Sequence, residues 1–186
     1  MEITKAVTAA ENDLRFPLGK FVVPNEFTPE MREQFIETIK NLPQNITRAI
    51  ENLSDEQLDT PYRPAGWTVR QTVHHIADSH LNSFCRFKLA LTEENPTIRP
   101  YWEDRWAELP DSRMPTEVSM KIIEGVHARW TNLLEAMSGA DFQRKLLHPE
   151  SGEWTLEKML ALYEWHSRHH TAHIVNLRAR NGWQND

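Results

Sequence analysis

The sequence predicts an all-α protein: an antiparallel four-helix bundle that follows an irregular N-terminal arm. Four long segments carry apolar residues at helical spacing, residues that cap helices stand at their starts, and the alternation typical of strands occurs only in short stretches. The chain has 186 residues, near the upper end of one compact domain, so we expect a single domain over residues 1–186.

The first helix is expected at residues 27–53, after an arm over residues 1–27 that shows no sustained helical period. Thr28 can cap this helix, and Pro29 suits its first turn because the first helical residue needs no N–H donor. Pro43 lacks an N–H and clashes with the preceding turn, so it should kink or interrupt the helix.

The second helix is expected at residues 68–95. Thr68 and Gln71 have the spacing of a capping box, in which each side chain bonds the backbone N–H of the other residue, and this sets the start of the helix. Pro96 and Pro100 should end it, because proline cannot continue a helix.

The third and fourth helices are expected at residues 115–138 and 155–180. Gly139 should stop the third helix and Gly182 the fourth, because glycine takes the left-handed backbone conformation that commonly ends a helix. A short segment and a turn at residues 148–154 connect the two.

The loop over residues 96–114 is long for a compact domain, and loops of this length are often functional. It carries Trp102 and Trp106, two large aromatic side chains. Two roles stay open for it: a lid that closes over a site, or a contact between two copies of the chain.

Composition excludes several classes of protein. The net charge of −6 gives no electrostatic basis for binding nucleic acid. Cys85 is the only cysteine, so the chain forms no internal disulfide. No run approaches the roughly 18 apolar residues of a membrane span, and the first residues lack the apolar core of a signal peptide. We expect a cytoplasmic protein with no membrane partner.

Four histidines stand close together on the fourth helix: His166, His169, His170 and His173. Counting at about 100° per residue places three of them on the stripe that should face the core, with His169 at its edge. Two pairs have the i,i+4 spacing that lets imidazoles bind one metal ion, and the pair His166–His170 lies nearer the centre of the stripe. The alternative is a set of core histidines bonded to their neighbours.

A third ligand must come from another helix, and the second helix offers His75 and His80. His80 falls on the apolar stripe, so periodicity alone favours it. His75 lies on a polar stripe that also carries Asp78 and Arg86, and this stripe is either a solvated face or the lining of a cleft. If the cleft lies between the second and fourth helices, His75 is the ligand. Counted from the Trp–Thr pairs that open both helices, His75 and His166 lie at similar depths.

Two blocks, residues 66–101 and 162–174, resemble the YfiT-like branch of the DinB superfamily, and the similarity covers most of the chain. The resemblance implies a four-helix bundle that binds a divalent metal through three histidines, one from the second helix and an i,i+4 pair from the last. Laid on this sequence, these are His75, His166 and His170, in place of His80. It also implies a metal-dependent hydrolase, or an S-transferase that uses a low-molecular-weight thiol such as bacillithiol, and a homodimer.

Three protein ligands leave one coordination position open, which is typical of a catalytic metal site. Water in that position ionises near neutral pH, and a thiol there is deprotonated. Asp78 could orient a ligand or act as a base, and Arg86 could bind a carboxylate of the substrate or of a thiol cosubstrate. We therefore predict one divalent metal ion per chain, zinc first and nickel second, and a small-molecule substrate. The alternative is a non-catalytic metal-binding or stress-response module.

Overall fold

The computed structural model describes residues 14–183. The part of the predicted N-terminal arm at residues 1–13 lies outside this range, and residues 14–28 form neither helix nor strand. Among the described residues, no helix is both long and apolar enough to cross a membrane.

The predicted four-helix bundle is confirmed. Its four long helices are α2 (Pro29–Ile50), α4 (Val69–Thr92), α6 (Thr116–Ala136) and α8 (Leu156–Asn181). Short elements connect them: α3 (Asp55–Leu58), α5 (Glu103–Trp106), the 3₁₀ helix η1 (Pro110–Arg113), α7 (Gly139–Phe142), β1 (Lys145–His148) and β2 (Gly152–Thr155). The two strands pair as one antiparallel hairpin, which occupies the place of the predicted turn.

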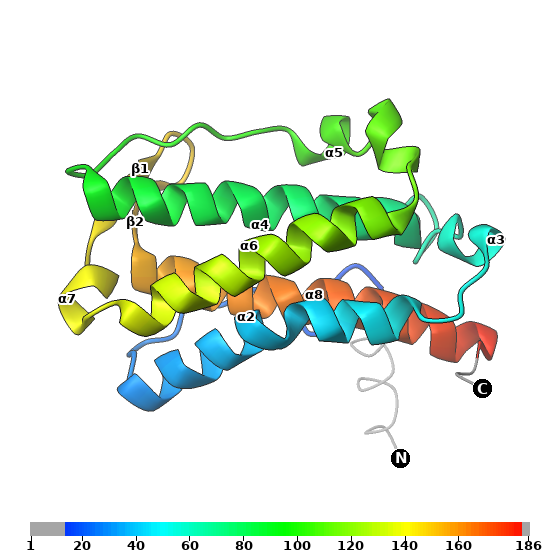
Figure 1. The fold of residues 1–186 in the computed structure, drawn as a ribbon, viewed down its shortest axis with the longest axis horizontal. Helices are drawn as coiled ribbons and strands as arrows, with labels where there is room; N and C mark the ends of the chain where they lie inside the picture. The colour runs from blue at the N-terminus through cyan, green and yellow to red at the C-terminus, as the bar shows by residue number, and fades with distance from the viewer. Residues whose placement is uncertain (1–13, 184–186) are drawn as a thin grey trace, which may run out of the picture.

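The helices do not simply alternate in direction. Figure 1 shows α2 and α8 running one way along the bundle and α4 and α6 running the other way. Helix α2 packs on α8 and α6, and α4 packs on α6 and α8, so the bundle contains both parallel and antiparallel neighbours. Parallel neighbours that follow one another in sequence need a connection as long as the helix itself. The segment 93–115 supplies it by returning along α4, which gives the long loop a structural purpose (Figure 1).

The predicted helix starts are confirmed. The Thr68 hydroxyl accepts a hydrogen bond from the Gln71 N–H at 3.0 Å, and the Gln71 side chain accepts one from the Thr68 N–H at 3.0 Å. Thr28 caps α2 by accepting a bond from the Met31 N–H at 3.3 Å. Pro43 does not interrupt α2, which is continuous from Pro29 to Ile50.

One predicted helix end is wrong and one is confirmed. Helix α6 ends at Ala136, and Gly139 is the first residue of α7, because Ser138 caps that short helix in a capping box with Asp141. Gly182 ends α8 with φ of 65°, in the left-handed region that favours glycine.

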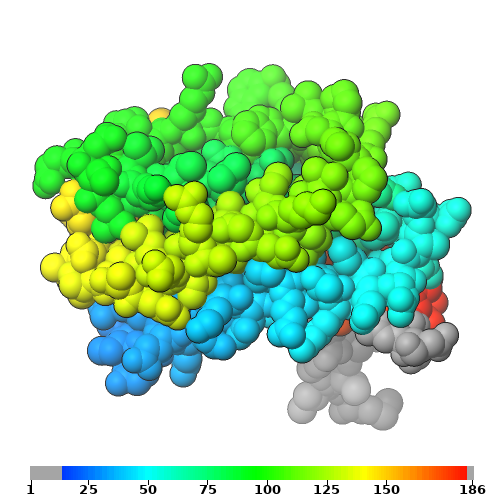
Figure 2. All heavy atoms as spheres, viewed as in Figure 1, coloured from blue at the N-terminus to red at the C-terminus, as the bar shows by residue number. Residues whose placement is uncertain are grey.

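Apolar side chains form two core clusters, one toward each end of the bundle. The first centres on Trp130 and includes Phe87 and Tyr163. The second includes Ile76 and Ile174. On α8 the histidines stand between the residues of these two clusters, so the middle of the bundle is polar. In Figure 2, α2 and α6 cover most of α8 on the face shown.

Candidate metal centre

Three histidines from two helices meet in the middle of the bundle: His75 of α4, and His166 and His170 of α8. One donor nitrogen from each lies within 4.8 Å of the others. Nε2 of His75 and Nε2 of His166 are 3.2 Å apart. His75 and His170 are buried and His166 is half-buried, so the cluster is largely shielded from solvent.

The donor atoms fit a divalent metal ion. Two nitrogens bound to a tetrahedral zinc ion at ~2.0–2.1 Å would be about 3.3 Å apart, close to the separation of the His75 and His166 nitrogens. Nδ1 of His170 is buried and has no hydrogen-bond partner among residues 14–183, so the protein leaves this polar atom unsatisfied. Burial lowers the pKa of His75 to about 4 and those of His166 and His170 well below the ordinary value. All three imidazoles are therefore neutral at pH 7, the form that binds metal.

His75 and His166 do not meet because they lie equally far from the starts of their helices, as we expected. Helices α4 and α8 run in opposite directions (Figure 1). The histidines meet because the two helices overlap along most of their length. Equal distance from the start of two antiparallel helices does not give equal depth.

A cavity of about 420 Å³ opens beside the three histidines. Its aromatic wall consists of Trp67, Tyr101 and Trp165. The polar residues that line it come from α4, the 96–114 loop, the β hairpin and α8: Ser79, Arg86, Glu103, His148, Glu150 and His169. A small molecule in this space would contact aromatic rings, a cation and the imidazoles of the three histidines together.

Arg86 and Asp78, the two predicted catalytic residues, are placed differently. Arg86 lines the cavity, and its guanidinium donates a hydrogen bond to the Arg99 carbonyl at 3.2 Å. Asp78 is half-buried on α4 and is not among the residues that line the cavity. Burial foremost, and then the charge of Asp111, raises the pKa of Asp78 to about 6.

Several lining residues were not found from the sequence. Glu103, His148 and Glu150 stand in the long loop or near the hairpin, and helical periodicity carries no information about such segments. His148 lines the cavity, and its Nδ1 accepts from the N–H of Glu150 at 3.2 Å. Trp165 precedes a metal-binding candidate in sequence, and that adjacency is the one signal that could have identified it.

His80, favoured by the apolar stripe, does not belong to the group of three. It points into the bundle interior, and its Nε2 lies 3.1 Å from Nδ1 of His166. His127 is also buried, and its Nε2 lies 3.0 Å from Nδ1 of His80. The other pair on α8 forms its own contact, with Nε2 of His173 3.0 Å from Nε2 of His169.

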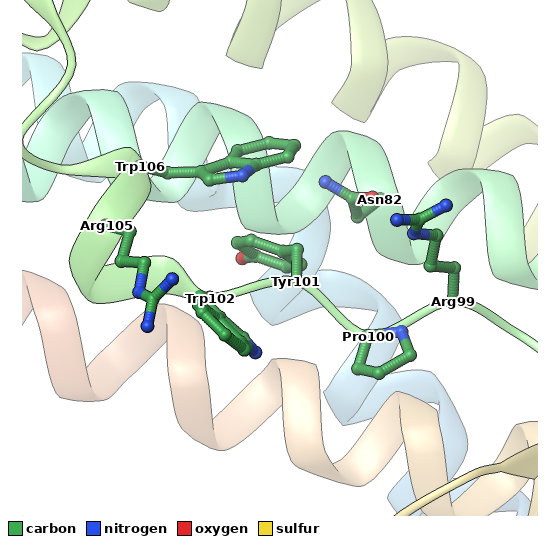
Figure 3. Close-up of a pocket in the computed structure, with 7 residues that line it drawn as sticks. All are labelled: Asn82, Arg99, Pro100, Tyr101, Trp102, Arg105 and Trp106. Carbon is green, nitrogen blue, oxygen red and sulfur yellow. The ribbon is translucent and has the colours of Figure 1, made fainter.

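A second hollow, of about 590 Å³, adjoins the first and shares Pro100 and Tyr101 with it. Figure 3 shows the side chains that line it: Asn82, Arg99, Pro100, Tyr101, Trp102, Arg105 and Trp106. Trp102 and Trp106 are exposed, and the Arg105 guanidinium lies 3.3 Å from the centre of the Trp102 ring. This exposed aromatic surface is compatible with either role of the loop, a lid or a contact between two chains.

Comparison with known proteins gives close matches. A family model of the DinB superfamily matches residues 38–174. A protein of Bacillus cereus (strain 03BB102), named "Putative metal-dependent hydrolase", is 54% identical over 172 residues, which cover 92% of this chain and 99% of the relative. A protein of Bacillus thuringiensis subsp. konkukian (strain 97-27), also named a putative metal-dependent hydrolase, matches with the same identity and coverage.

Two solved structures are similar to this one. YfiT from Bacillus subtilis, described as "a probable metal-dependent hydrolase with an unusual four-helix bundle topology", superposes with a TM-score of 0.89 at 46% identity, covering 92% of this chain and 99% of YfiT. The mycothiol-dependent maleylpyruvate isomerase superposes with a TM-score of 0.60 at 17% identity, covering 78% of this chain and 60% of the isomerase. The second likeness extends to the fold alone.

Proposed function

This chain belongs to the DinB superfamily, and from that premise we propose that it is a metal-dependent enzyme that binds one divalent ion through His75, His166 and His170. The observation that carries the proposal is the meeting of three neutral imidazoles, from two helices, at the wall of a cavity. Zinc is the proposed ion and nickel the alternative, because both accept imidazole ligands. A divalent ion with three such ligands lowers the pKa of water, or of a thiol, in its open position.

The side chains of the cavity would bind and orient a small substrate. The aromatic wall of Trp67, Tyr101 and Trp165 suits an apolar part of the molecule. Arg86 suits a carboxylate or another anionic group, because its guanidinium can donate two parallel hydrogen bonds. Asp78 does not line the cavity, and we propose for it a supporting role in proton exchange near neutral pH.

Hydrolysis is the reaction we propose first. The two Bacillus relatives described above are named putative metal-dependent hydrolases. In addition, the carboxylates of Glu103 and Glu150 line the cavity, where they could accept a proton. A small ester or amide whose anionic end meets Arg86 would fit these groups.

Thiol transfer is the second candidate, and one observation favours it. Glu164, two residues before His166 in the sequence, is bound by Arg168 at 2.6 Å and 3.1 Å, and Glu157, the other acidic residue of α8, is bound by Arg32 and Gln143. Helix α8 therefore presents no free carboxylate of the kind that serves as base in zinc peptidases. A thiol deprotonated by the metal itself needs no such base. In this reaction Arg86 would bind a carboxylate of a low-molecular-weight thiol.

The test compares both reactions on the same metal-loaded preparation. Hydrolysis of a panel of esters and amides without added thiol would support the hydrolase. Conjugation of a low-molecular-weight thiol to monochlorobimane, above the uncatalysed rate, would support the transferase. Neither activity at any metal loading would leave a non-catalytic metal-binding module as the better description.

The homodimer and the cytoplasmic location stay predictions. Light scattering of the purified chain and of a Trp102→Ala/Trp106→Ala variant tests the dimer. A fall in mass in the variant would assign the loop to the contact between chains. A change in turnover at constant mass would assign it to a lid.

A further inference from the structure

Two histidines that the metal site does not use are among the most deeply buried polar residues of the protein. His80 of α4 is 0% exposed and His127 of α6 is 1% exposed. Both pack against the ring of Trp130. An imidazole in such a place is costly unless both of its nitrogens have partners. The partners of these two rings are therefore informative.

The two rings connect His166 to a backbone carbonyl on the far side of the bundle. Nδ1 of His166 lies 3.1 Å from Nε2 of His80. Nδ1 of His80 lies 3.0 Å from Nε2 of His127. Nδ1 of His127 lies 2.6 Å from the carbonyl oxygen of Ile39 in α2. Every ring nitrogen of His80 and His127 is used, and the series crosses helices α8, α4, α6 and α2.

The Ile39 carbonyl, at the end of this series of hydrogen bonds, determines which nitrogen donates and which accepts in each of them. A carbonyl oxygen only accepts, so His127 must donate from Nδ1. Neutral His127 then accepts at Nε2, which requires His80 to donate from its own Nδ1. Neutral His80 in turn accepts at Nε2 from Nδ1–H of His166. The proton of His166 is thereby held on the side away from the cavity, and the lone pair of its Nε2 faces His75.

Pro43 explains why the Ile39 carbonyl can take this role. In an α-helix the carbonyl of residue 39 accepts from the N–H of residue 43, and proline has none. Helix α2 continues through Pro43, so the backbone hydrogen bonds of the helix leave the Ile39 carbonyl oxygen without a donor. His127 supplies a donor to this oxygen from a neighbouring helix.

The surroundings keep both rings neutral, as this ordering of bonds requires. His80 and His127 are 0% and 1% exposed, and burial without a compensating charge disfavours the charged form of an imidazole. Neither ring faces a carboxylate in the hydrogen bonds described above, so the series carries no charge at pH 7.

From these contacts we infer that His80 and His127 are positioning residues, which hold His166 in the tautomer whose Nε2 is free to bind metal, with the Ile39 carbonyl beside Pro43 as the fixed end. The inference rests on the proposed metal-binding role of His166. Partners that orient a metal-binding histidine in this way typically change metal affinity by about 10- to 100-fold.

The first experiment reads the protons directly and needs no metal. Nitrogen-15 NMR of the full-length metal-free protein at pH 7.5 should show His80, His127 and His166 all protonated on Nδ1. A proton on Nε2 of His80 or His127 would overturn the inference. Absence of metal binding by the wild-type chain would instead overturn the proposed function, and the NMR result would still decide the tautomers.

The second experiment measures affinity for Zn²⁺ by competition with a chromophoric chelator. His80→Phe keeps a ring in the core but removes both bonds, and should weaken binding by about 10- to 100-fold. His80→Gln should restore much of the affinity, because its amide can accept from His166 and donate to His127. Equal affinity in the wild type and both variants would contradict the positioning role.

His74→Phe is the matched control. His74 lies on the same helix, is 6% exposed, and bonds the Ser119 hydroxyl at 2.6 Å and the Met114 carbonyl at 2.9 Å, away from the three metal-binding candidates. The His74→Phe variant should lose stability as His80→Phe does, yet keep wild-type affinity for Zn²⁺. A similar loss of affinity in His74→Phe would show that general destabilisation, and no ordered series of bonds, explains the effect.

Discussion

Helix α8 carries two histidine pairs with the same spacing and different surroundings. His166 and His170 meet His75 of α4 at the wall of the cavity. His169 and His173 meet each other at 3.0 Å, and their rings stack on Trp165 and Tyr62 with centres 4.3 Å and 3.9 Å away. Among residues 14–183, no third His, Cys, Asp or Glu completes a metal-binding group with the second pair.

The difference between the pairs lies in their neighbours and not in their charge. Burial lowers the pKa of His169 to about 4 and that of His173 to about 3, so the second pair is as neutral as the first. Spacing and protonation state therefore make either pair able to bind a metal. Only the pair His166–His170 has a third imidazole nitrogen close to it, that of His75 on α4.

The largest expected effect is loss of the metal. We expect His75→Ala, His166→Ala and His170→Ala to abolish stoichiometric metal binding, because two remaining imidazoles hold a divalent ion poorly. His169→Ala and His173→Ala, at the same spacing on the same helix, should retain it. Metal content per chain after dialysis, measured by mass spectrometry, checks both sets. Full retention in the first set would refute the assignment of these three residues.

The second pair should matter for stability instead. His173→Ala removes a buried ring from Tyr62 and leaves His169 without its partner, so it should lower the free energy of unfolding of the metal-free protein by about 2 kcal/mol or more. Urea unfolding of the metal-free wild type and variant measures this change. An unchanged unfolding midpoint together with lost metal would reverse the roles of the two pairs.

Stability should also depend on pH, and His173 is one of the buried histidines that contribute to this dependence. An unfolded histidine has a pKa of about 6.5, whereas that of folded His173 is about 3. Between these values the unfolded chain binds more protons, so the free energy of unfolding falls as pH drops below about 6.5, by up to about 1.4 kcal/mol per unit for each such group. His173→Phe should flatten the fall seen in urea unfolding of the metal-free protein between pH 6.5 and 5.

Asp78 should affect the pH dependence of stability in the opposite direction to His173, so it serves as a control. Its pKa is raised to about 6, so between about 4 and 6 the folded state binds the extra proton and gains stability as pH falls. Asp78→Asn should therefore steepen the loss of stability below pH 6. A flatter profile in this variant would contradict the environment that the structure gives to Asp78.

The smallest effect is expected for Glu164, which is close to the first pair in sequence and is bound to Arg168. Its ion pair has the i,i+4 geometry with a half-exposed Arg168 side chain, and such pairs contribute roughly 0.3–0.5 kcal/mol. Glu164→Gln should change stability by about that amount and leave metal content and turnover at wild-type values. A large loss of turnover at full metal content would instead identify Glu164 as a base.

Much of the fold was predictable because its signals are local. Thr28, Thr68 and Gln71 bond backbone groups within three residues, and Gly182 adopts its backbone conformation by itself, so sequence alone gave these helix ends. Gly139 was misread because Ser138 offered a competing local signal, the cap of a further short helix. Helix α2 continues through Pro43, and the Ile39 carbonyl that Pro43 leaves without its helical donor is bound by His127 of α6, a contact that no local pattern reports.

The candidate site, like the fold, could be predicted from the sequence only in part. Helical periodicity placed histidines on buried stripes of two helices, but it left the choice between His75 and His80 open, and only the resemblance to a family decided it. The structure shows both to be in contact with His166, one from the cavity and one from the core. Five positions apart on a helix, the two rings point in directions that differ by about 140°.

The sequence by itself determined the four helices, most of their ends and the histidines that could bind a metal. Tertiary structure alone decided the helix directions, the cavity residues from the loop and hairpin, and the connection of His127 through His80 to His166. The physical reason is that periodicity fixes the direction of a side chain about its own helix axis. Which helix, loop or carbonyl lies in that direction is a non-local property, set when the four helices pack together.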